Sequence, residues 1–141
     1  MEFMSLDPKS ESRKLMVTVL GSPGLGKTSL AAKFPKPFFL RTEDGLKSLD
    51  NLDTDARASQ LIERTNDGVQ GYDLFMDQLR NLYTQEHNFE TLVIDSVTRL
   101  HSLIEAKILS KEPSKNMASC EGGFHQGYKV AAKMHMDVFE A

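Results

Sequence analysis

The sequence predicts an α/β fold with three layers, α/β/α, in which helices cover both faces of a mainly parallel sheet. Segments of strand character alternate along the chain with segments of helical periodicity, which is typical of such a fold. An early run, residues 15–20 ("LMVTVL"), is apolar and rich in β-branched residues, as expected of a strand buried on both faces. A later run, residues 91–96 ("TLVIDS"), has the same character. We therefore expect one domain over residues 14–141, preceded by a disordered tail over residues 1–13.

Length and composition place the chain among intracellular globular proteins. It has 141 residues, of which 40% are hydrophobic, and a net charge of −3, which suits one cytoplasmic domain. Its single cysteine, Cys120, excludes an internal disulfide framework and offers no pair for a zinc site. The sequence has neither an apolar run of roughly 20 residues nor a signal peptide, so we expect no membrane partner. Met4 is a second methionine near the start, which suggests that residues 1–3 precede the native start and do not belong to the fold.

The remaining elements follow from periodicity and from helix breakers. The segment "KTSLAAKF" contains good helix formers and is expected to end at Phe34, before Pro35. Further strands are expected at residues 38–42 and, more weakly, at residues 59–65. Apolar residues at helical spacing predict two helices, marked by Tyr72, Phe75, Leu79 and Leu82 and by Val97, Leu100, Ile104 and Ile108. A polar loop is expected over residues 110–126, and a last helix from near Gly127.

The stretch that follows the first strand candidate fits the phosphate-binding loop pattern. In "VLGSPGLGKTSLAAKF" a glycine, four further residues and then Gly-Lys-Thr stand at the required spacing, between a predicted strand and a predicted helix. Glycines let successive backbone N–H groups point at one anion, and the lysine can reach the outer phosphates. The predicted nucleotide-binding residues are Gly21, Ser22, Pro23, Gly24, Leu25, Gly26, Lys27, Thr28 and Ser29. The alternative is an ordinary turn between a strand and a helix.

A magnesium site is predicted from one hydroxyl and one carboxylate. Thr28 is the loop residue whose hydroxyl can ligate Mg²⁺, and Asp95 ends a predicted strand at the sheet edge where α/β proteins bind ligands. We expect their side-chain oxygens to lie about 4–6 Å apart, because they share the ion directly or through one water. The alternative for Asp95 is an ordinary helix N-cap.

Hydrolysis needs a group that orients or activates water, and Glu43 is the candidate. It follows the strand predicted at residues 38–42, so it is expected at the same sheet edge as the phosphate loop, with Lys27 as the second catalytic candidate. The alternative is that Glu43 and Asp44 only form a turn before Gly45.

Three motifs in this order resemble the RecA-like branch of P-loop ATPases, particularly the phage-type nucleotide-binding proteins related to RecA recombinases. They are "GSPGLGKTSLA", "FFLRTEDGL" and "LVIDSVTRL". The resemblance implies an ATP-binding, Mg²⁺-dependent ATPase of DNA recombination or repair in the cytoplasm of a bacterial or phage-infected cell. It also implies that Glu43 is catalytic, that Asp95 holds the metal, and that a neighbouring copy of the chain completes the site in a homo-oligomer.

The chain departs from that branch at its end. Relatives continue into a further strand, which carries a polar sensor residue, and into a second DNA-contacting loop. This chain ends at Ala141, before either. We therefore expect the N-terminal part of a RecA-like core with an incomplete sheet, which binds nucleotide and by itself hydrolyses it slowly or not at all.

Single-stranded DNA is the partner that the resemblance implies for the segment "EGGFHQGYKVAAKMHMDVFE". Around it the chain has a local excess of three positive charges, from Lys107, Lys111, Lys115, Lys129 and Lys133 against Glu112 and Glu121. Phe124 and Tyr128 could stack on bases. The alternatives are a solvated face for the lysines and core positions for the two aromatic residues.

Two functions from different classes remain open at this point. The first is an ATP-hydrolysing motor or recombinase domain, and the second is a nucleotide-binding regulatory or assembly module without significant hydrolysis. A small-molecule kinase is a weaker third, since its arginine-rich lid has no counterpart among the scattered arginines. A metalloprotease or zinc site is not expected, because His101 with Glu105, and Cys120 with His125, lack partners of the required spacing.

Overall fold

The computed structural model describes residues 15–45, 55–66 and 68–140. A parallel three-stranded sheet has the order β2-β1-β5, and its members are β1 (Pro37–Arg41), β2 (Arg57–Ala58) and β5 (Thr91–Asp95). A separate antiparallel pair is formed by β3 (Thr65–Asn66) and β4 (Val69–Gln70). The tail expected over residues 1–13 lies outside the described residues.

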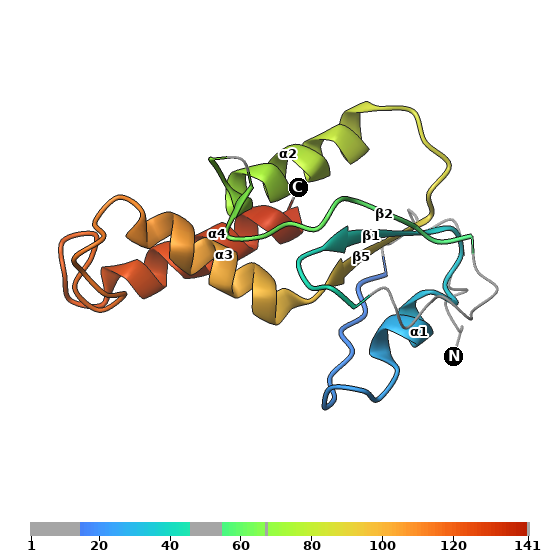
Figure 1. The fold of residues 1–141 in the computed structure, drawn as a ribbon, viewed down its shortest axis with the longest axis horizontal. Helices are drawn as coiled ribbons and strands as arrows, with labels where there is room; N and C mark the ends of the chain where they lie inside the picture. The colour runs from blue at the N-terminus through green and yellow to red at the C-terminus, as the bar shows by residue number, and fades with distance from the viewer. Residues whose placement is uncertain (1–14, 46–54, 67, 141) are drawn as a thin grey trace, which may run out of the picture.

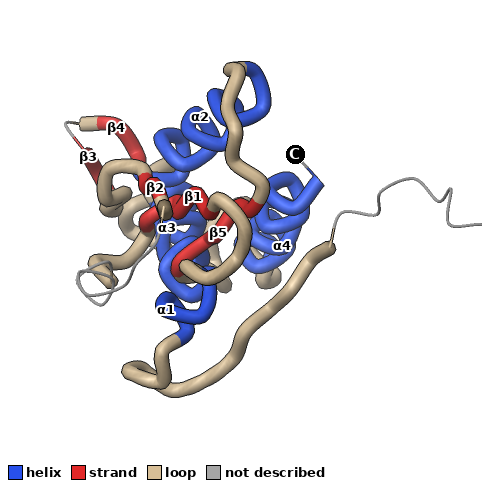
Figure 2. Tube along the Cα trace, turned by 90° about the vertical axis from the view of Figure 1, so that its right-hand side faces the viewer, coloured by secondary structure: helices blue, strands red, loops and turns tan. Residues whose placement is uncertain are grey.

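Four helices accompany the strands in the described part of the chain: α1 (Lys27–Ala31), α2 (Gly71–Thr84), α3 (Val97–Leu109) and α4 (Gln126–Glu140). In both Figure 1 and Figure 2 the strands β1 and β5 lie between α2 on one side and α1 on the other. Helices α3 and α4 run side by side away from the sheet toward a loop at the far end (Figure 1). The predicted α/β class with a mainly parallel sheet and helices on both sides is thus confirmed in outline.

The hydrophobic core lies where the three longer helices meet β1. Tyr72, Phe75 and Leu79 of α2 are buried on one face of that helix, which is the face predicted from the apolar spacing. They pack with α3, whose Leu100 and Ile104 are fully buried. The helices predicted around residues 72–83 and from residue 97 are therefore confirmed.

The strand predicted at residues 15–20 is absent from the sheet, so that prediction is wrong. All six residues are exposed, with Leu15 at 83% and Leu20 at 90% of full exposure. An apolar β-branched run has the propensity for a strand, but a strand forms only where another strand accepts its backbone hydrogen bonds. The described residues offer this run no such partner.

The strand predicted at residues 59–65 is also wrong in its bounds, since β2 ends at Ala58. The chain still follows β1, because the backbone N–H groups of Ser59 and Ile62 donate to the carbonyls of Phe39 and Arg41 at 2.9 and 2.7 Å. Between these two bonds the hydroxyl of Ser59 accepts the N–H of Arg41 at 3.1 Å. A side chain thus replaces a backbone partner, which interrupts the regular ladder.

The later elements agree with prediction to within a residue or two. The strand predicted at residues 38–42 is β1, the one predicted at residues 91–96 is β5, and the helix expected from near Gly127 is α4. Every residue of β1 pairs with β5, from Pro37 with Thr91 to Arg41 with Asp95. The strands therefore end together, and the residues that follow them meet at one edge of the sheet.

Candidate nucleotide-binding site

The loop between residue 20 and α1 depends on two glycines. Gly24 and Gly26 have φ angles of +82° and +81°, and Gly26 is the N-cap of α1. An added Cβ would meet nothing within 4 Å at either position. The requirement for glycine therefore comes from the left-handed backbone, which L side chains rarely adopt, and not from crowding.

The ammonium group of Lys27 folds back over the loop that precedes it. Its Nζ donates to the carbonyl oxygens of Gly21 and Ser22 at 2.8 and 3.0 Å. An ammonium has three N–H donors, so at least one remains for a further acceptor. The predicted phosphate-binding cation thus lies directly beside the backbone predicted to surround the phosphates.

Thr28 and Asp95 meet although 67 positions separate them in the sequence. The hydroxyl of Thr28, in α1, donates to Oδ2 of Asp95, at the end of β5, at 2.8 Å. Gly45 lies against both, since a Cβ there would be 3.5 Å from Asp95 Oδ2 and 3.7 Å from Thr28 Oγ1. The expected separation of about 4–6 Å is therefore wrong, because the two groups bond to each other directly.

The residues present fit a magnesium ion. Both are hard oxygen donors, and oxygens on adjacent corners of an octahedron with bonds of about 2.1 Å lie roughly 3 Å apart, close to the observed 2.8 Å. Within the described residues no cluster of three or more His, Cys, Asp or Glu side chains could hold a metal. Mg²⁺ does not need one, because it is commonly bound by one or two protein ligands together with phosphates and water.

Glu43 lies at the same edge of the sheet. It follows β1 in an exposed turn, and its Oε2 accepts a hydrogen bond from the hydroxyl of Ser96 at 2.8 Å. Ser96 is the residue after Asp95, so the predicted water-orienting carboxylate and the predicted metal ligand are joined through neighbouring residues. The structure thus brings Thr28, Asp95 and Glu43 into one cluster, with Lys27 adjacent to Thr28 in the chain.

Four residues around this cluster were missed by the sequence analysis in these roles: Arg41, Thr42, Gly45 and Ser96. Arg41 forms an ion pair with Asp44 at 2.9 Å across the turn. Asp44 therefore stabilises the turn, whereas Glu43 contacts Ser96. The sequence did contain a signal for two of these residues, because the hydroxyl residues Thr42 and Ser96 directly flank Glu43 and Asp95. Which partners they choose depends on the register of β1 with β5, which the sequence does not disclose.

A glycine-rich loop before a helix, a lysine and a threonine at its start, and an acid at the end of a parallel strand together define a P-loop nucleotide-binding site. The comparison with protein families agrees: residues 13–141 match the AAA domain family, and the chain belongs to that family. Membership supports nucleotide-binding ATPase activity. Neither the curated proteins nor the solved structures gave a match. In the described part of the chain no helix is both long and apolar enough to cross a membrane.

Five lysines lie in or near the loop between α3 and α4, residues 110–125, which we call the late loop. This lysine cluster has less unpaired positive charge than its composition indicates. Lys107 pairs with Asp73 at 2.5 Å, Lys111 with Glu121 at 3.2 Å, and Lys115 with Glu112. Among the described residues only Lys129 and Lys133 of that cluster have no ion-pair partner. Three of the five lysines are therefore paired with carboxylates, which lowers the local excess of positive charge.

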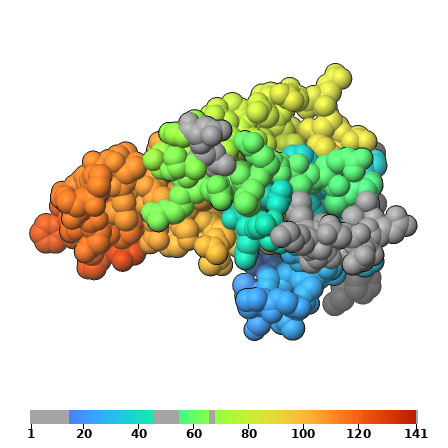
Figure 3. All heavy atoms as spheres, viewed as in Figure 1, coloured from blue at the N-terminus to red at the C-terminus, as the bar shows by residue number. Residues whose placement is uncertain are grey.

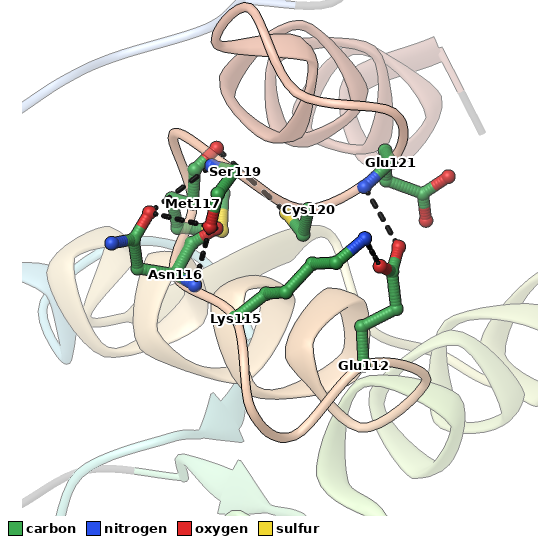
Figure 4. A network of polar contacts seen from close by, with 7 residues as sticks. All are labelled: Glu112, Lys115, Asn116, Met117, Ser119, Cys120 and Glu121. Carbon is green, nitrogen blue, oxygen red and sulfur yellow. Dashed lines mark hydrogen bonds and ion pairs between the residues drawn. The ribbon is translucent and has the colours of Figure 1, made fainter.

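The late loop itself is held by a polar network (Figure 4). The side-chain carbonyl of Asn116 accepts the N–H groups of Ala118 and Ser119 at 3.0 and 3.1 Å, and Glu112 accepts the N–H of Glu121 at 2.9 Å. From this framework Phe124 projects into solvent with 91% of its surface exposed. The alternative of a core position is thus wrong for Phe124.

Proposed function

We propose that this chain binds ATP together with Mg²⁺ and hydrolyses it, as a RecA-like member of the P-loop ATPases with one nucleotide-binding domain over residues 14–141. The observation that carries the proposal is the contact between Thr28 and Asp95. It joins the helix after a glycine-rich loop to the acid at the end of a parallel strand, with an oxygen separation of 2.8 Å. Neither an ordinary turn nor an N-cap aspartate requires that contact.

Each residue then has a separate task. Backbone N–H groups of residues 21–29, apart from Pro23, which has none, surround the phosphates, and Lys27 donates to their outer oxygens. Thr28 and Asp95 hold the Mg²⁺, which when bound neutralises charge on the phosphate oxygens. Glu43 accepts a proton from the attacking water or orients it, with one carboxylate oxygen already fixed by Ser96.

The finer role, in phage-type DNA recombination or repair with single-stranded DNA and a second copy of the chain as partners, rests on the order of the three motifs. A contact with a base-bearing anionic strand is supported by exposed Phe124 and by Lys129 and Lys133, which have no ion-pair partner among the described residues. The charge support is weaker than that from five lysines, so aromatic stacking is expected to contribute the larger share.

A binding module without turnover is the second candidate. It is favoured by residues 15–20, which are exposed and pair with no strand among the described residues, so that in this part of the chain no strand lies behind the phosphate loop. A loop that is not fixed to the sheet can still bind phosphates through N–H groups. It is less able to hold them in the alignment that in-line attack by water requires.

Binding is tested by calorimetric titration of ATP in the presence of Mg²⁺. Lys27→Ala should weaken affinity by about 10–100-fold, the loss expected for a charged hydrogen bond of about 1.5–3 kcal/mol. Thr28→Ala should chiefly reduce the dependence on Mg²⁺. Lys33→Ala is the matched control, an exposed lysine just beyond the same helix, and should leave affinity unchanged. Equal affinities for wild type and Lys27→Ala would exclude the phosphate-loop assignment.

Turnover is tested by phosphate release from ATP, with and without single-stranded DNA. Glu43→Gln keeps the shape of the side chain and removes its basicity, so hydrolysis should fall by about 10²–10⁴-fold while binding stays near normal. Asp44→Asn is the control, since Asp44 pairs with Arg41. A chain that binds ATP and releases no phosphate would favour the binding module.

A further inference from the structure

The hydroxyl of Thr42 fastens the ends of β1 and β5 together beyond their last paired residues. Its Oγ1 accepts the N–H of Ser96 and donates to the carbonyl oxygen of Ser96, both at 2.9 Å. The backbone N–H of Thr42 also donates to the carbonyl of Asp95 at 3.1 Å. Thr42 is 6% exposed, so these bonds are sheltered from water. They fix the backbone on which Ser96 stands.

The hydroxyl of Ser96 has two different partners. It donates its single proton to Oε2 of Glu43 at 2.8 Å, and its oxygen accepts the N–H of Arg99 at 3.4 Å as the N-cap of α3. A hydroxyl offers one donor and two acceptor sites. The contact with Glu43 and the helix cap therefore use separate capacities of the same group, and a substitution can remove one without the other.

The bond to Ser96 restricts the side chain of Glu43, for which the described residues show no other hydrogen bond or ion pair. Glu43 is exposed in a turn, and an unrestrained glutamate loses rotamer entropy when it is held in one geometry. The bond to Ser96 holds Oε2 and leaves Oε1 for another donor. A water molecule bonded to Oε1 would then lie at a position set by β1 and β5 and not by a mobile turn.

We propose that Ser96, held in place by Thr42, is a positioning residue for Glu43. It fixes the carboxylate of Glu43 in the orientation in which Glu43 acts on the attacking water, and it ties that carboxylate to Asp95 through adjacent residues. This inference rests on the proposed ATP hydrolysis. It assigns Ser96 no contact with ATP or with the metal, so its effect falls on the rate of the chemical step and not on nucleotide affinity.

Three substitutions of Ser96 separate positioning from helix capping. Ser96→Ala removes both the donor and the cap, and loss of the cap lowers the melting temperature. Ser96→Gly also removes the donor but keeps most of the capping preference, since glycine is tolerated at an N-cap far better than alanine is. Ser96→Thr keeps the hydroxyl and both functions. Positioning predicts that Ala and Gly behave alike in turnover, whereas capping predicts that Gly resembles wild type.

The experiment measures kcat and KM for Mg-ATP, ATP affinity by calorimetry, and the melting temperature of each variant. Ser96→Ala and Ser96→Gly should both lower kcat by about 10²-fold, the scale of an ångström of misplacement, with affinity unchanged. Ser96→Thr should restore the rate. Glu43→Gln in the Ser96→Gly background should cost less than it does in wild type, because the two residues act as a unit.

The outcomes separate this inference from the function on which it rests. If wild type hydrolyses ATP and Ser96→Gly does so at the wild-type rate, Ser96 does not position Glu43, and the proposed function stands. If kcat falls only in Ser96→Ala, in step with its melting temperature, Ser96 is a helix cap and the inference is overturned. If wild type binds ATP without hydrolysing it, the proposed hydrolysis fails and the positioning role fails with it.

Discussion

The two ends of the molecule differ in the amount of apolar surface that they bury. At the helical end Phe75, Leu100 and Ile104 are fully buried among α2, α3 and α4. At the phosphate-loop end α1 has no buried residue, and the loop residue Leu25 is 72% exposed. In the space-filling view of Figure 3 this segment forms a lobe that projects below the body of the molecule.

The difference shows that the fold and the site depend on separate sets of interactions. The helical end supplies the apolar burial that makes a native state stable. The site end is assembled from polar contacts at the sheet edge, chiefly those of Thr28 with Asp95 and of Ser96 with Glu43. Regions with few buried apolar contacts open locally at low cost in free energy. We therefore expect substitutions at the two ends to affect different measurements.

The largest effect is expected from truncation in the helical core. Phe75→Ala should lower the free energy of unfolding by about 3–5 kcal/mol, because it removes a fully buried ring and leaves a cavity. Leu20→Ala at the other end should change it by no more than about 0.5 kcal/mol, since Leu20 is 90% exposed. Urea denaturation followed by circular dichroism measures both. Comparable losses for the two variants would mean that residues 15–20 contribute to the packed fold.

A smaller effect is expected from paired glycine substitutions. A Cβ at Gly127 in α4 would lie 2.5 Å from both Cys120 Sγ and the carbonyl oxygen of Met117, so Gly127→Ala must displace the late loop, at a cost of about 1–3 kcal/mol. Gly24→Ala meets no atom within 4 Å but has to adopt a φ of +82°. It should keep most of the stability and weaken ATP binding, because its backbone no longer fits the phosphate-binding turn.

Denaturant unfolding and ATP titration on the same two proteins check this pair. Gly127→Ala should lose stability and keep its affinity for ATP, and Gly24→Ala should show the reverse pattern. If Gly127→Ala weakens ATP binding as strongly as Gly24→Ala, the late loop and the phosphate loop are coupled. The comparison drawn between the two ends would then be wrong.

The helical end could be predicted from the sequence because its signals are local. Tyr72, Phe75 and Leu79 recur at helical spacing, and the face they define is the buried face of α2. The same holds for β1 and β5, whose apolar runs are short and have each other as partners. For residues 15–20 the composition was equally strong and the prediction was wrong. A strand needs a neighbour, and the neighbour is a property of the fold rather than of the run.

The members of the candidate site could be named from the sequence, but their contacts could not. The chemistry of their side chains at motif positions predicts the roles of Lys27, Thr28, Asp95 and Glu43. Sequence reasoning gave no indication that Thr28 bonds Asp95 directly, or that Ser96 stands between Asp95 and Glu43. Those contacts follow from the pairing of Arg41 with Asp95 at the end of the ladder, a register that two separate strands cannot specify before they meet.

The smallest effect concerns pH and the interface of α3 with α4. His101 Nδ1 and His135 Nε2 are 3.0 Å apart, and His101 Nε2 is 3.5 Å from Glu105. Burial first, and the neighbouring His101 second, lower the pKa of His135 below its usual 6.5. The bond between the two rings needs one donor and one acceptor nitrogen, so at least one ring must be neutral. Protonation of both rings therefore opposes the packing of α4 on α3.

The sign of the pH dependence follows from that lowered pKa. As pH falls below about 6.5, the unfolded chain binds a proton at His135 before the folded chain does. The free energy of unfolding therefore becomes smaller as the pH is lowered through this window. The contribution is fully present above pH 6.5 and is lost as pH falls through the folded pKa.

His135→Gln keeps a hydrogen-bonding side chain that does not titrate, so its stability should change less than that of wild type between pH 7.5 and 5.5. Urea midpoints across that range test this. Identical profiles would show that the histidine pair contributes nothing to the stability of the helical end. Lys115 lowers the pKa of Glu112. Glu112 should therefore change the free energy of unfolding only in a separate pH range, below about pH 4.5.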